Sequence, residues 1–237
     1  MASQTGTLEE GQVRAMFDRI AGVYDRMNAV MTAGLDRRWR SRAADLAAVG
    51  PGDRVLDVAT GTGDLALELA QRVAPDGEVV GSDFAEAMLE RAREKAAGRT
   101  DVDFEWGDAL ALDHPDDAFA AATVAFGARN FADLHRGLAE MARVVRSGGR
   151  IVVLEITTPQ APPLSWFYGL WFDRVVPGLG RVVGDQDAYS YLPNSVRRFP
   201  GPEGLAAAMD EAGLRDIGWV LTAGGIIAIH HGTVRDG

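Results

Sequence analysis

Short apolar runs alternate with segments of helical periodicity through the middle of the chain, from residue 54 to residue 156. Each apolar run is bounded by turn-forming residues and is short enough to be a buried strand. The five runs occupy residues 54–59, 78–83, 102–108, 119–127 and 149–156. Because strand–helix–strand connections are right-handed and parallel, this order predicts an α/β fold with a mostly parallel sheet.

The segments on either side of this core follow other patterns. The N-terminal stretch predicts short helices at 10–20 and 26–33 that break at Gly22, and a further helix at 36–49. After the core, a proline-rich stretch shows no strand–helix alternation and is interpreted as an insertion. We expect one domain made of a helical cap at 1–50, a core at 51–157, an insertion at 158–203, and a closing helix and strands at 204–237.

The composition narrows the class of protein further. The 237 residues carry a net charge of −10, which argues against nucleic acid as a partner because phosphate binding needs a basic surface. The absence of cysteine excludes disulfides, thiolate nucleophiles and cysteine-ligated zinc, and no histidine pair has metal-binding spacing on a helix, so no metal is expected. Lys95 is the only lysine, which argues against Schiff-base chemistry. With no signal peptide and no run of 18 apolar residues, we expect a cytoplasmic protein able to touch the inner membrane face.

A glycine-rich loop, DVATGTGDLA at residues 57–66, joins the first predicted strand to the helix after it. Gly61, Gly63 and Ala66 satisfy the dinucleotide fingerprint G-x-G-x-x-A. Asp83 follows Gly63 by twenty residues, as in that fingerprint. Strand ends and a helix N-terminus form the usual ligand crevice of such folds. A tight structural turn without a ligand would give the same pattern, so the loop alone does not identify a ligand.

Acidic residues end three successive predicted strands beside this loop. Asp57 precedes the loop, where a carboxylate suits a ligand that carries an ammonium and a sulfonium. Asp83 would bind ribose hydroxyls, while Asp108 can accept from an adenine amine beside the backbone N–H of Ala109. Each acid alone is commonly a turn or helix cap, but together they favour S-adenosylmethionine over a nicotinamide dinucleotide. The predicted cofactor-binding residues are Asp57, Gly61, Thr62, Gly63, Asp83, Phe84, Asp108 and Ala109.

Five sequence blocks together resemble the ubiquinone/menaquinone biosynthesis C-methyltransferase family, and the resemblance covers nearly the whole chain. The blocks are YDRMNAVMTAGLDRRW at 24–39, FGARN at 126–130, RSGGRIVVLEITTP at 146–159, YSYLPNSVRRFP at 189–200 and TAGGIIAIHHG at 222–232. The resemblance implies the Rossmann-like fold of class I S-adenosylmethionine-dependent methyltransferases. Two departures concern the cofactor: Ala125 replaces a commoner serine, leaving a backbone contact, and Ala59 stands where many methyltransferases have glycine.

The resemblance also implies a reaction, the transfer of a methyl group to a ring carbon of a lipid-soluble, prenylated hydroquinone, from demethylmenaquinol to menaquinol. The phenolic hydroxyl beside that carbon has a pKa of about 10, so the site must assist its ionisation. Arg129 would stabilise the developing phenolate, and Asn130 and Tyr24 would position the hydroxyl or a relay water. The proton acceptor stays open: Asp25, Asp36 and His114 are the candidates.

The first block is interpreted as a lid over the quinol head, and the insertion as a wall for its isoprenoid tail. Family members often have histidine where this chain has Asp36. The segment LSWFYGLWFDRVVPGL at 164–179 is too short and interrupted to span a bilayer, and either lines the tail or is a helix buried in the core. The predicted substrate-binding residues are Asn28, Asp36, Arg37, Trp166 and Trp171.

Three alternatives remain on the sequence alone. A methyltransferase acting on another phenolic or polyketide acceptor would keep every cofactor residue and differ in the acceptor pocket. A nicotinamide oxidoreductase would use the same glycine loop, and a non-catalytic quinone-binding protein would keep the apolar pocket without methyl transfer. A homodimer and a transient contact with the membrane surface are further expectations.

Overall fold

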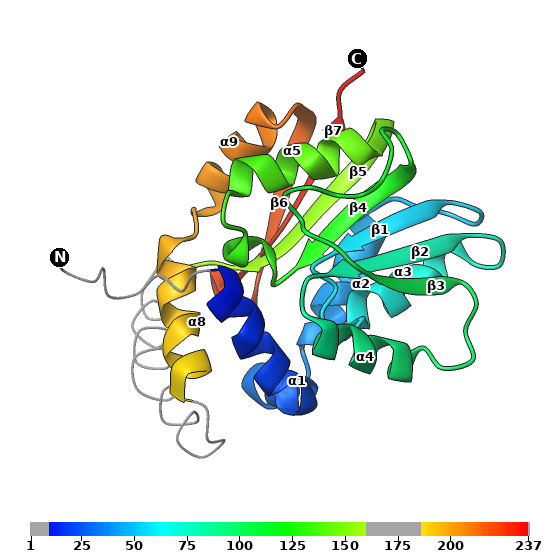
Figure 1. Cartoon of the computed structure of the whole chain (residues 1–237). Helices are drawn as coiled ribbons and strands as arrows, with labels where there is room; N and C mark the ends of the chain where they lie inside the picture. The colour runs from blue at the N-terminus through cyan, green and yellow to red at the C-terminus, as the bar shows by residue number, and fades with distance from the viewer. Residues whose placement is uncertain (1–9, 160–185, 237) are drawn as a thin grey trace.

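The computed structural model describes residues 10–159 and 186–236, which form a seven-stranded sheet with helices on both faces (Figure 1). The strands are β1 Arg54–Val58, β2 Glu78–Asp83, β3 Val102–Trp106, β4 Phe119–Ala125, β5 Val145–Ile156, β6 Leu214–Thr222 and β7 Ile227–Val234. Their order is β3-β2-β1-β4-β5-β7-β6. The first five strands are parallel, and β7 pairs antiparallel with both β5 and β6. The predicted α/β fold with a mostly parallel sheet is therefore confirmed.

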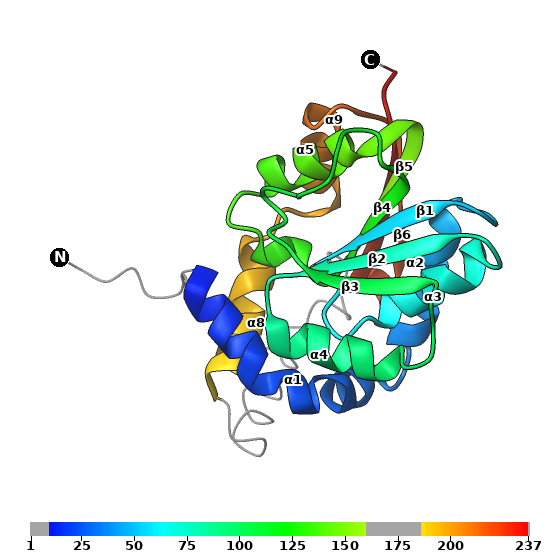
Figure 2. The ribbon, with the colours of Figure 1, turned by 45° about the vertical axis from the view of Figure 1, so that its right-hand side comes forward.

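The helices form two layers and a cover at one end of the sheet (Figures 1 and 2). They are α1 Glu10–Thr32, α2 Asp36–Leu46, α3 Asp64–Val73, α4 Glu86–Lys95, α5 Leu134–Val144, α8 Gln186–Arg198 and α9 Pro202–Glu211, with 3-10 turns η1 at Ala128–Asn130 and η3 at Ala223–Gly225. One hydrophobic core joins α2, α3 and α4 to the sheet, and a second joins α5 and α9 to the other face. Among the residues that the structure describes, no helix is both long and apolar enough to cross a bilayer.

The central strands are buried on both faces, which explains their continuous apolar sequences. β4 is FAAATVA, and its first six residues are all buried. The helix after it, α5, is amphipathic and begins at Asp133, whose carboxylate accepts a hydrogen bond from the Arg136 backbone N–H at 3.0 Å. Local propensity, patterning and capping agree here, so the core follows directly from the sequence.

The N-terminal helix differs from the sequence prediction. We expected two short helices with a break at Gly22, but α1 is continuous from Glu10 to Thr32. A glycine inside a helix costs only about 1 kcal/mol. Here the helix packs through Ile20 and Ala21 against Met88 of α4, and this burial outweighs the local cost.

The segment predicted as an insertion also contains more regular structure than expected. Its second half forms α8, a helix of 13 residues that continues through Pro193. Tyr191 of α8 packs against Val13 and Met16 of α1. The two helices therefore lie together at the end of the sheet where the parallel strands finish.

Candidate functional site

A cavity opens at the carboxyl ends of the parallel strands and encloses about 710 Å³ of space, counting the open solvent at its mouth. The residues contributed by strand ends and loops include Gly61, Asp83, Phe84, Asp108, Ala109, Leu110, Ala125, Phe126 and Asn130. Phe17 and Tyr24 of α1 complete the lining, so the N-terminal helix covers the crevice that the sheet leaves open.

Asp83 is the buried acid of this cavity. Its Oδ2 accepts a hydrogen bond from the Gly61 N–H at 2.8 Å, and its Oδ1 accepts one from the Ala85 N–H at 2.9 Å. Burial raises its pKa to about 6, although these backbone donors favour the charged form. Each carboxylate oxygen keeps a second acceptor position. Asp83 can therefore accept hydrogen bonds from a pair of neighbouring hydroxyls while it holds the glycine loop.

The glycine loop leaves room for a ligand at Gly61. This residue has a left-handed backbone, φ 57°, and a Cβ built on it would meet nothing within 4 Å. A side chain there would project into free space at the cavity wall. Gly63 has a different reason to be glycine, because a Cβ would lie 2.8 Å from the Phe104 ring. The first glycine thus keeps ligand space open, and the second allows α3 to pack closely.

The third strand contributes an acceptor and a backbone donor. Asp108 and Ala109 both line the cavity, and Asp108 Oδ1 accepts a hydrogen bond from the Leu110 N–H at 2.8 Å. Phe84 and Leu110 provide apolar surface beside them. A flat heterocycle with an exocyclic amine matches this combination of one carboxylate, one backbone N–H and apolar walls.

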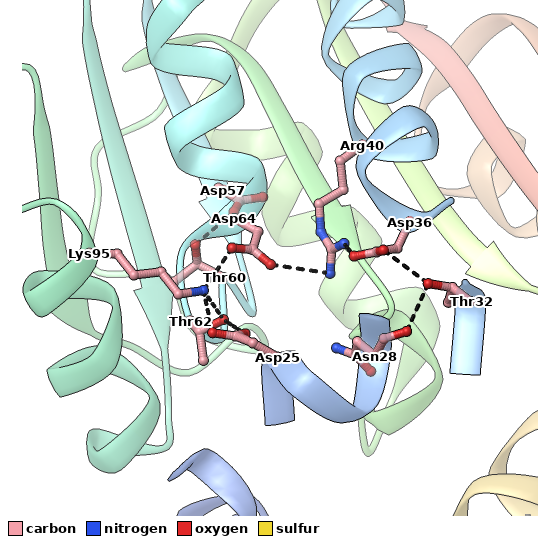
Figure 3. Close-up of polar contacts among 10 residues, drawn as sticks. All are labelled: Asp25, Asn28, Thr32, Asp36, Arg40, Asp57, Thr60, Thr62, Asp64 and Lys95. Carbon is pink, nitrogen blue, oxygen red and sulfur yellow. Dashed lines mark hydrogen bonds and ion pairs between the residues drawn. The ribbon is translucent and has the colours of Figure 1, made fainter. Parts of the chain in front are cut away.

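Three predicted cofactor residues do not line the cavity, which corrects the sequence prediction. Asp57 is 1% exposed, and its carboxylate accepts hydrogen bonds from the hydroxyls of Thr60 and Thr123, each at 2.7 Å. Burial raises its pKa to about 6. Asp57 therefore ties the glycine loop to β4 from behind, where it cannot face an ammonium. Gly63 packs against Phe104. Thr62 is outside the lining, and its hydroxyl contacts Asp25 and Lys95, as Figure 3 shows.

Tyr24 and Asn130, for which the sequence predicts a role in positioning the substrate, both line the cavity. The Tyr191 hydroxyl donates to Asn130 Oδ1 at 3.0 Å. Burial raises the pKa of Tyr191, so this phenol stays protonated and keeps its donor role. Tyr191 uses one acceptor position of the amide oxygen, and the amide N–H groups of Asn130 remain as donors toward the cavity. Tyr191 was not singled out from the sequence, because its partner lies 61 residues earlier.

Arg129 does not line the cavity, contrary to its predicted position at the quinol head. Its Nη1 pairs with Glu155 Oε1 at 2.7 Å, and the two side chains are 8% and 1% exposed. Glu155 also accepts hydrogen bonds from the backbone N–H groups of Arg129 and Ile156. The cation is already compensated by a buried acid on β5, so the pair holds η1 against the sheet.

The other predicted substrate residues of the cap also lie away from the cavity lining. Asp36 is buried and accepts from Arg40 and from the Thr32 hydroxyl, while Arg37 is exposed. The backbone carbonyl of Asn28 accepts a hydrogen bond from the Thr32 hydroxyl, and Asn28 is not part of the lining. The candidate proton acceptors Asp25, Asp36 and His114 are likewise absent from the lining. Trp166 and Trp171 lie outside the described residues.

Several apolar residues line the cavity without having been predicted as site residues: Phe17, Met88, Leu110, Phe126, Phe131 and Ala132. Phe17 could have been found, because Val13, Phe17 and Tyr24 follow one face of α1 at helical spacing.

The backbone around Phe126 is strained in a way the sequence does not reveal. Phe126 at the end of β4 and Ala59 at the end of β1 are non-glycine residues with left-handed backbones, φ 59° and 51°. A Cβ built on Gly127 would lie 2.6 Å from the Ala59 Cβ. The two strand ends that floor the cavity are therefore tightly packed against each other.

Solved structures with this architecture are numerous. The [4+2]-cyclase SpnF is 20% identical with a TM-score of 0.71, covering 99% of this chain and 100% of that one. A structure described as an S-adenosylmethionine-dependent methyltransferase, a possible histamine N-methyltransferase from Thermotoga maritima, is 19% identical with a TM-score of 0.65. The match covers 92% of this chain and 98% of that one. These likenesses establish the fold, the Rossmann-like fold of class I methyltransferases.

Sequence relatives give the family. A protein of Thermus thermophilus named demethylmenaquinone methyltransferase is 50% identical over 219 residues, 92% of this chain and 99% of the relative. A protein of Deinococcus radiodurans with the same name is 50% identical over 219 residues, 91% of this chain and 90% of the relative. The ubiquinone/menaquinone biosynthesis C-methyltransferase UbiE of Geobacter sulfurreducens is 42% identical over 228 residues, 94% of this chain and 89% of the relative. The family model described as the ubiE/COQ5 methyltransferase family matches residues 5–234. This confirms the resemblance seen in the sequence blocks, and the chain belongs to the ubiE/COQ5 methyltransferase family.

Proposed function

We propose that this chain transfers a methyl group from S-adenosylmethionine to a ring carbon of demethylmenaquinol, giving menaquinol. Family membership and the names of its relatives support the methyl transfer and the quinol acceptor. The observation that carries the proposal is that one cavity is lined both by Asp83, which can accept from a pair of hydroxyls, and by Tyr24 and Asn130, which can donate to a phenolic oxygen.

The residues of the cofactor side fit S-adenosylmethionine. Asp83 would accept hydrogen bonds from its ribose hydroxyls, and Gly61 leaves the space that a Cβ would fill. Asp108 and Ala109 would receive the adenine amine and a ring nitrogen. The backbone of Ala125 lines the same wall. When bound, S-adenosylmethionine supplies an electrophilic methyl group on its sulfonium.

The acceptor side has to make a ring carbon nucleophilic. Hydrogen bonds from Asn130 and Tyr24 to the neighbouring phenolic oxygen stabilise the phenolate, and the electron density on the ring carbon rises as that oxygen ionises. Arg129 adds positive charge behind the amide, reduced by its pairing with Glu155. Positioning contributes as well, because methyl transfer requires an in-line approach.

The proton of the phenol leaves to water in this proposal. After the methyl group has moved, leaving S-adenosylhomocysteine, the methylated ring carbon loses its own hydrogen to water and the ring oxygen is reprotonated, so that one proton is released overall. The only carboxylates that line the cavity within the described part of the chain are Asp83 and Asp108, and both are assigned to the cofactor. A phenol pKa of about 10, lowered by the two donors, makes the active ionised fraction grow with pH. Turnover should therefore increase from neutral to mildly alkaline pH.

Contact with a membrane surface and self-association complete the proposal. Val30 and Leu35, where α1 passes into α2, are 71% and 41% exposed, which supports a transient contact with the inner membrane face from which a prenylated quinol could enter. Trp219 and Leu221 are exposed on the edge strand β6, which supports a homodimer. Vesicle flotation and light scattering would test the two parts separately.

An assay with labelled S-adenosylmethionine and a panel of reduced and oxidised quinones tests the reaction. We expect methylation of demethylmenaquinol and none of the oxidised quinone, which has no ionisable hydroxyl. Asn130→Ala should lower turnover by about 10²–10³, the cost of losing one donor to a developing oxyanion, with cofactor affinity little changed. Faster methylation of an unrelated phenol would point to another acceptor. Binding of the quinol without methyl transfer would favour a carrier, and tight binding of NADH would favour an oxidoreductase.

A further inference from the structure

The only lysine of the chain lies at the last position of α4 and joins three separate segments. Lys95 Nζ is 2.6 Å from Asp25 Oδ2 of α1, 2.7 Å from Asp64 Oδ1 at the start of α3, and 2.9 Å from the Thr62 hydroxyl in the glycine loop. An ammonium has three donors, and these contacts use all three. Figure 3 shows the group converging from these elements onto one point.

The acceptors around Lys95 would not stay together without it. Asp25 and Asp64 are both acidic, and their like charges would separate the segments that carry them. The Thr62 hydroxyl donates to Asp25 Oδ1 at 2.6 Å, so one threonine both receives from Lys95 and gives to Asp25. The Lys95 ammonium therefore bridges the cap helix and the glycine loop.

Two of the three partners of Lys95 adjoin a residue of the cavity wall. Asp25 follows Tyr24, and Thr62 follows Gly61, and both Tyr24 and Gly61 line the cavity. Fixing Asp25 to Thr62 therefore fixes the separation of the acceptor-side phenol from the cofactor loop. The network continues on the far side, where Asp64 lies 3.8 Å from Arg40, which pairs with Asp36 of the same helix.

We propose that Lys95 is a positioning residue for methyl transfer: it latches the cap helix α1 onto the glycine loop and so sets the distance between Tyr24 and the bound cofactor. This inference rests on the proposed function for its kinetic consequence, but the latch itself is a property of the fold. The side chain of Lys95 is 28% exposed and that of Asp25 39%. Salt therefore weakens the latch, because ions screen partly exposed pairs over a Debye length of about 10 Å at 0.1 M and about 3 Å at 1 M.

Three variants test the latch by kinetics. Lys95→Met removes the charge at similar length, Lys95→Arg keeps it, and Arg99→Met is the matched control, because it removes one positive charge from an exposed pair with Asp101 that joins no separate element. We expect Lys95→Met to lower kcat by at least about tenfold, since small misplacements of reacting groups cost about 10²-fold. Cofactor affinity should weaken by less, Lys95→Arg should recover most of the activity, and Arg99→Met should match the parent.

Hydrogen exchange provides a readout that does not depend on activity. In Lys95→Met, amides of the second half of α1 should exchange about tenfold faster or more, while those of the central strands keep their protection. In the parent, about 1 M NaCl should accelerate the same amides, and in Lys95→Met salt should have little further effect. Unchanged exchange in α1 would overturn the latch. If the parent methylates no quinol but the exchange pattern holds, the proposed function fails and the latch stands.

Chemical modification of the folded parent avoids any defect in folding. Because Lys95 is the sole lysine, acetylation of amines can reach only this side chain and the chain's amino terminus. Acetylated parent should lose activity as Lys95→Met does, and Lys95→Arg, treated in the same way, should not. Equal loss in both proteins would assign the effect to the amino terminus and contradict the inference.

Discussion

Replacing Asp83 with asparagine should change how stability depends on pH. Burial raises the pKa of Asp83 from 3.8 to about 6. Between these two values the folded protein still holds a proton that the unfolded chain has released, so the free energy of unfolding falls as the pH rises through this window. At about 1.4 kcal/mol per pH unit, the buried charge costs about 3 kcal/mol above pH 6. The group is 6% exposed, so solvent screening reduces this figure little.

Asparagine has nearly the shape of a protonated carboxyl group and cannot ionise. Asp83→Asn and the parent should therefore be similar in stability near about pH 4, and the variant should be more stable by up to about 3 kcal/mol near about pH 8. Urea unfolding followed by tryptophan fluorescence across this range measures the difference. Asp57 titrates in both proteins, but the charge of Asp83 is one of the causes that raise its pKa, so the measured difference also contains a smaller contribution from Asp57. Asp113→Asn, at an exposed carboxylate, is the control that should show no such trend.

The same substitution should weaken the binding of the cofactor. A charged carboxylate is the stronger acceptor for ribose hydroxyls, so calorimetry should show the parent's affinity for S-adenosylmethionine falling as the pH drops below about 6. Asp83→Asn should bind more weakly by about 1–3 kcal/mol at neutral pH and should lose that pH dependence. A stability difference that stays constant with pH would refute the buried charge. An unchanged affinity would remove Asp83 from the cofactor site.

Other parts of the structure give further expectations. Glu155→Ala should leave the Arg129 charge buried and unpaired, and urea unfolding should show a loss of about 3–5 kcal/mol; a loss below about 1 kcal/mol would mean that water already screens the pair. Arg129→Ala, assayed well below its unfolding temperature, should lower turnover by less than Asn130→Ala does, because Arg129 lies outside the cavity lining and is paired with Glu155; a loss of about 10²–10³, as for a donor that contacts the oxyanion, would contradict this structural role. Burial lowers the pKa of His230 to about 4, so the folded protein takes up this proton later than the unfolded chain on acidification, and stability should fall by about 3 kcal/mol between pH 6.5 and 4. His230→Phe should lack this loss, and parallel pH curves for the two proteins would contradict it. Replacing Trp166 and Trp171 by Ser should flatten the rise in quinol affinity with tail length, about 0.8 kcal/mol per buried CH₂, while activity on a tail-less quinol persists; full tail dependence in the folded double variant would place the tail elsewhere.

The sheet and two of the three strand-end acids could be predicted because the signals are local. Parallel strands buried on both faces read as continuous apolar runs, and their carboxyl ends meet at one edge. Asp83 is the last residue of β2, Asp108 comes two residues after the end of β3, and both line the cavity. Asp57 also follows this rule in the sequence, but its side chain is bound by Thr123, a partner 66 residues away on the neighbouring strand. The sequence does not reveal that pairing.

The cap and the acceptor side were harder to predict for the same reason. Arg129 was expected to be an open cation, yet its partner Glu155 comes 26 residues later on β5. Gly22 predicted a break because glycine weakens isolated helices, whereas packing on α4 decides the outcome. The family blocks marked the right segments. They did not say which face of each segment meets the cavity.

The contact between Ala59 and Gly127 links the evolution of two loops that are distant in sequence. The Ala59 methyl group fills the space between the two loops, so position 127 has no room for a side chain as long as position 59 is alanine. With glycine at 59, which also relieves the left-handed backbone, alanine at 127 would next meet Val124 Cγ2 at 3.2 Å, a contact that a small shift can accommodate. We expect these positions to covary among relatives, with alanine and glycine exchanging places. Gly127→Ala should be strongly destabilising alone and much less so beside Ala59→Gly, giving a coupling energy within the range of about 0.5–3 kcal/mol found for residues in contact.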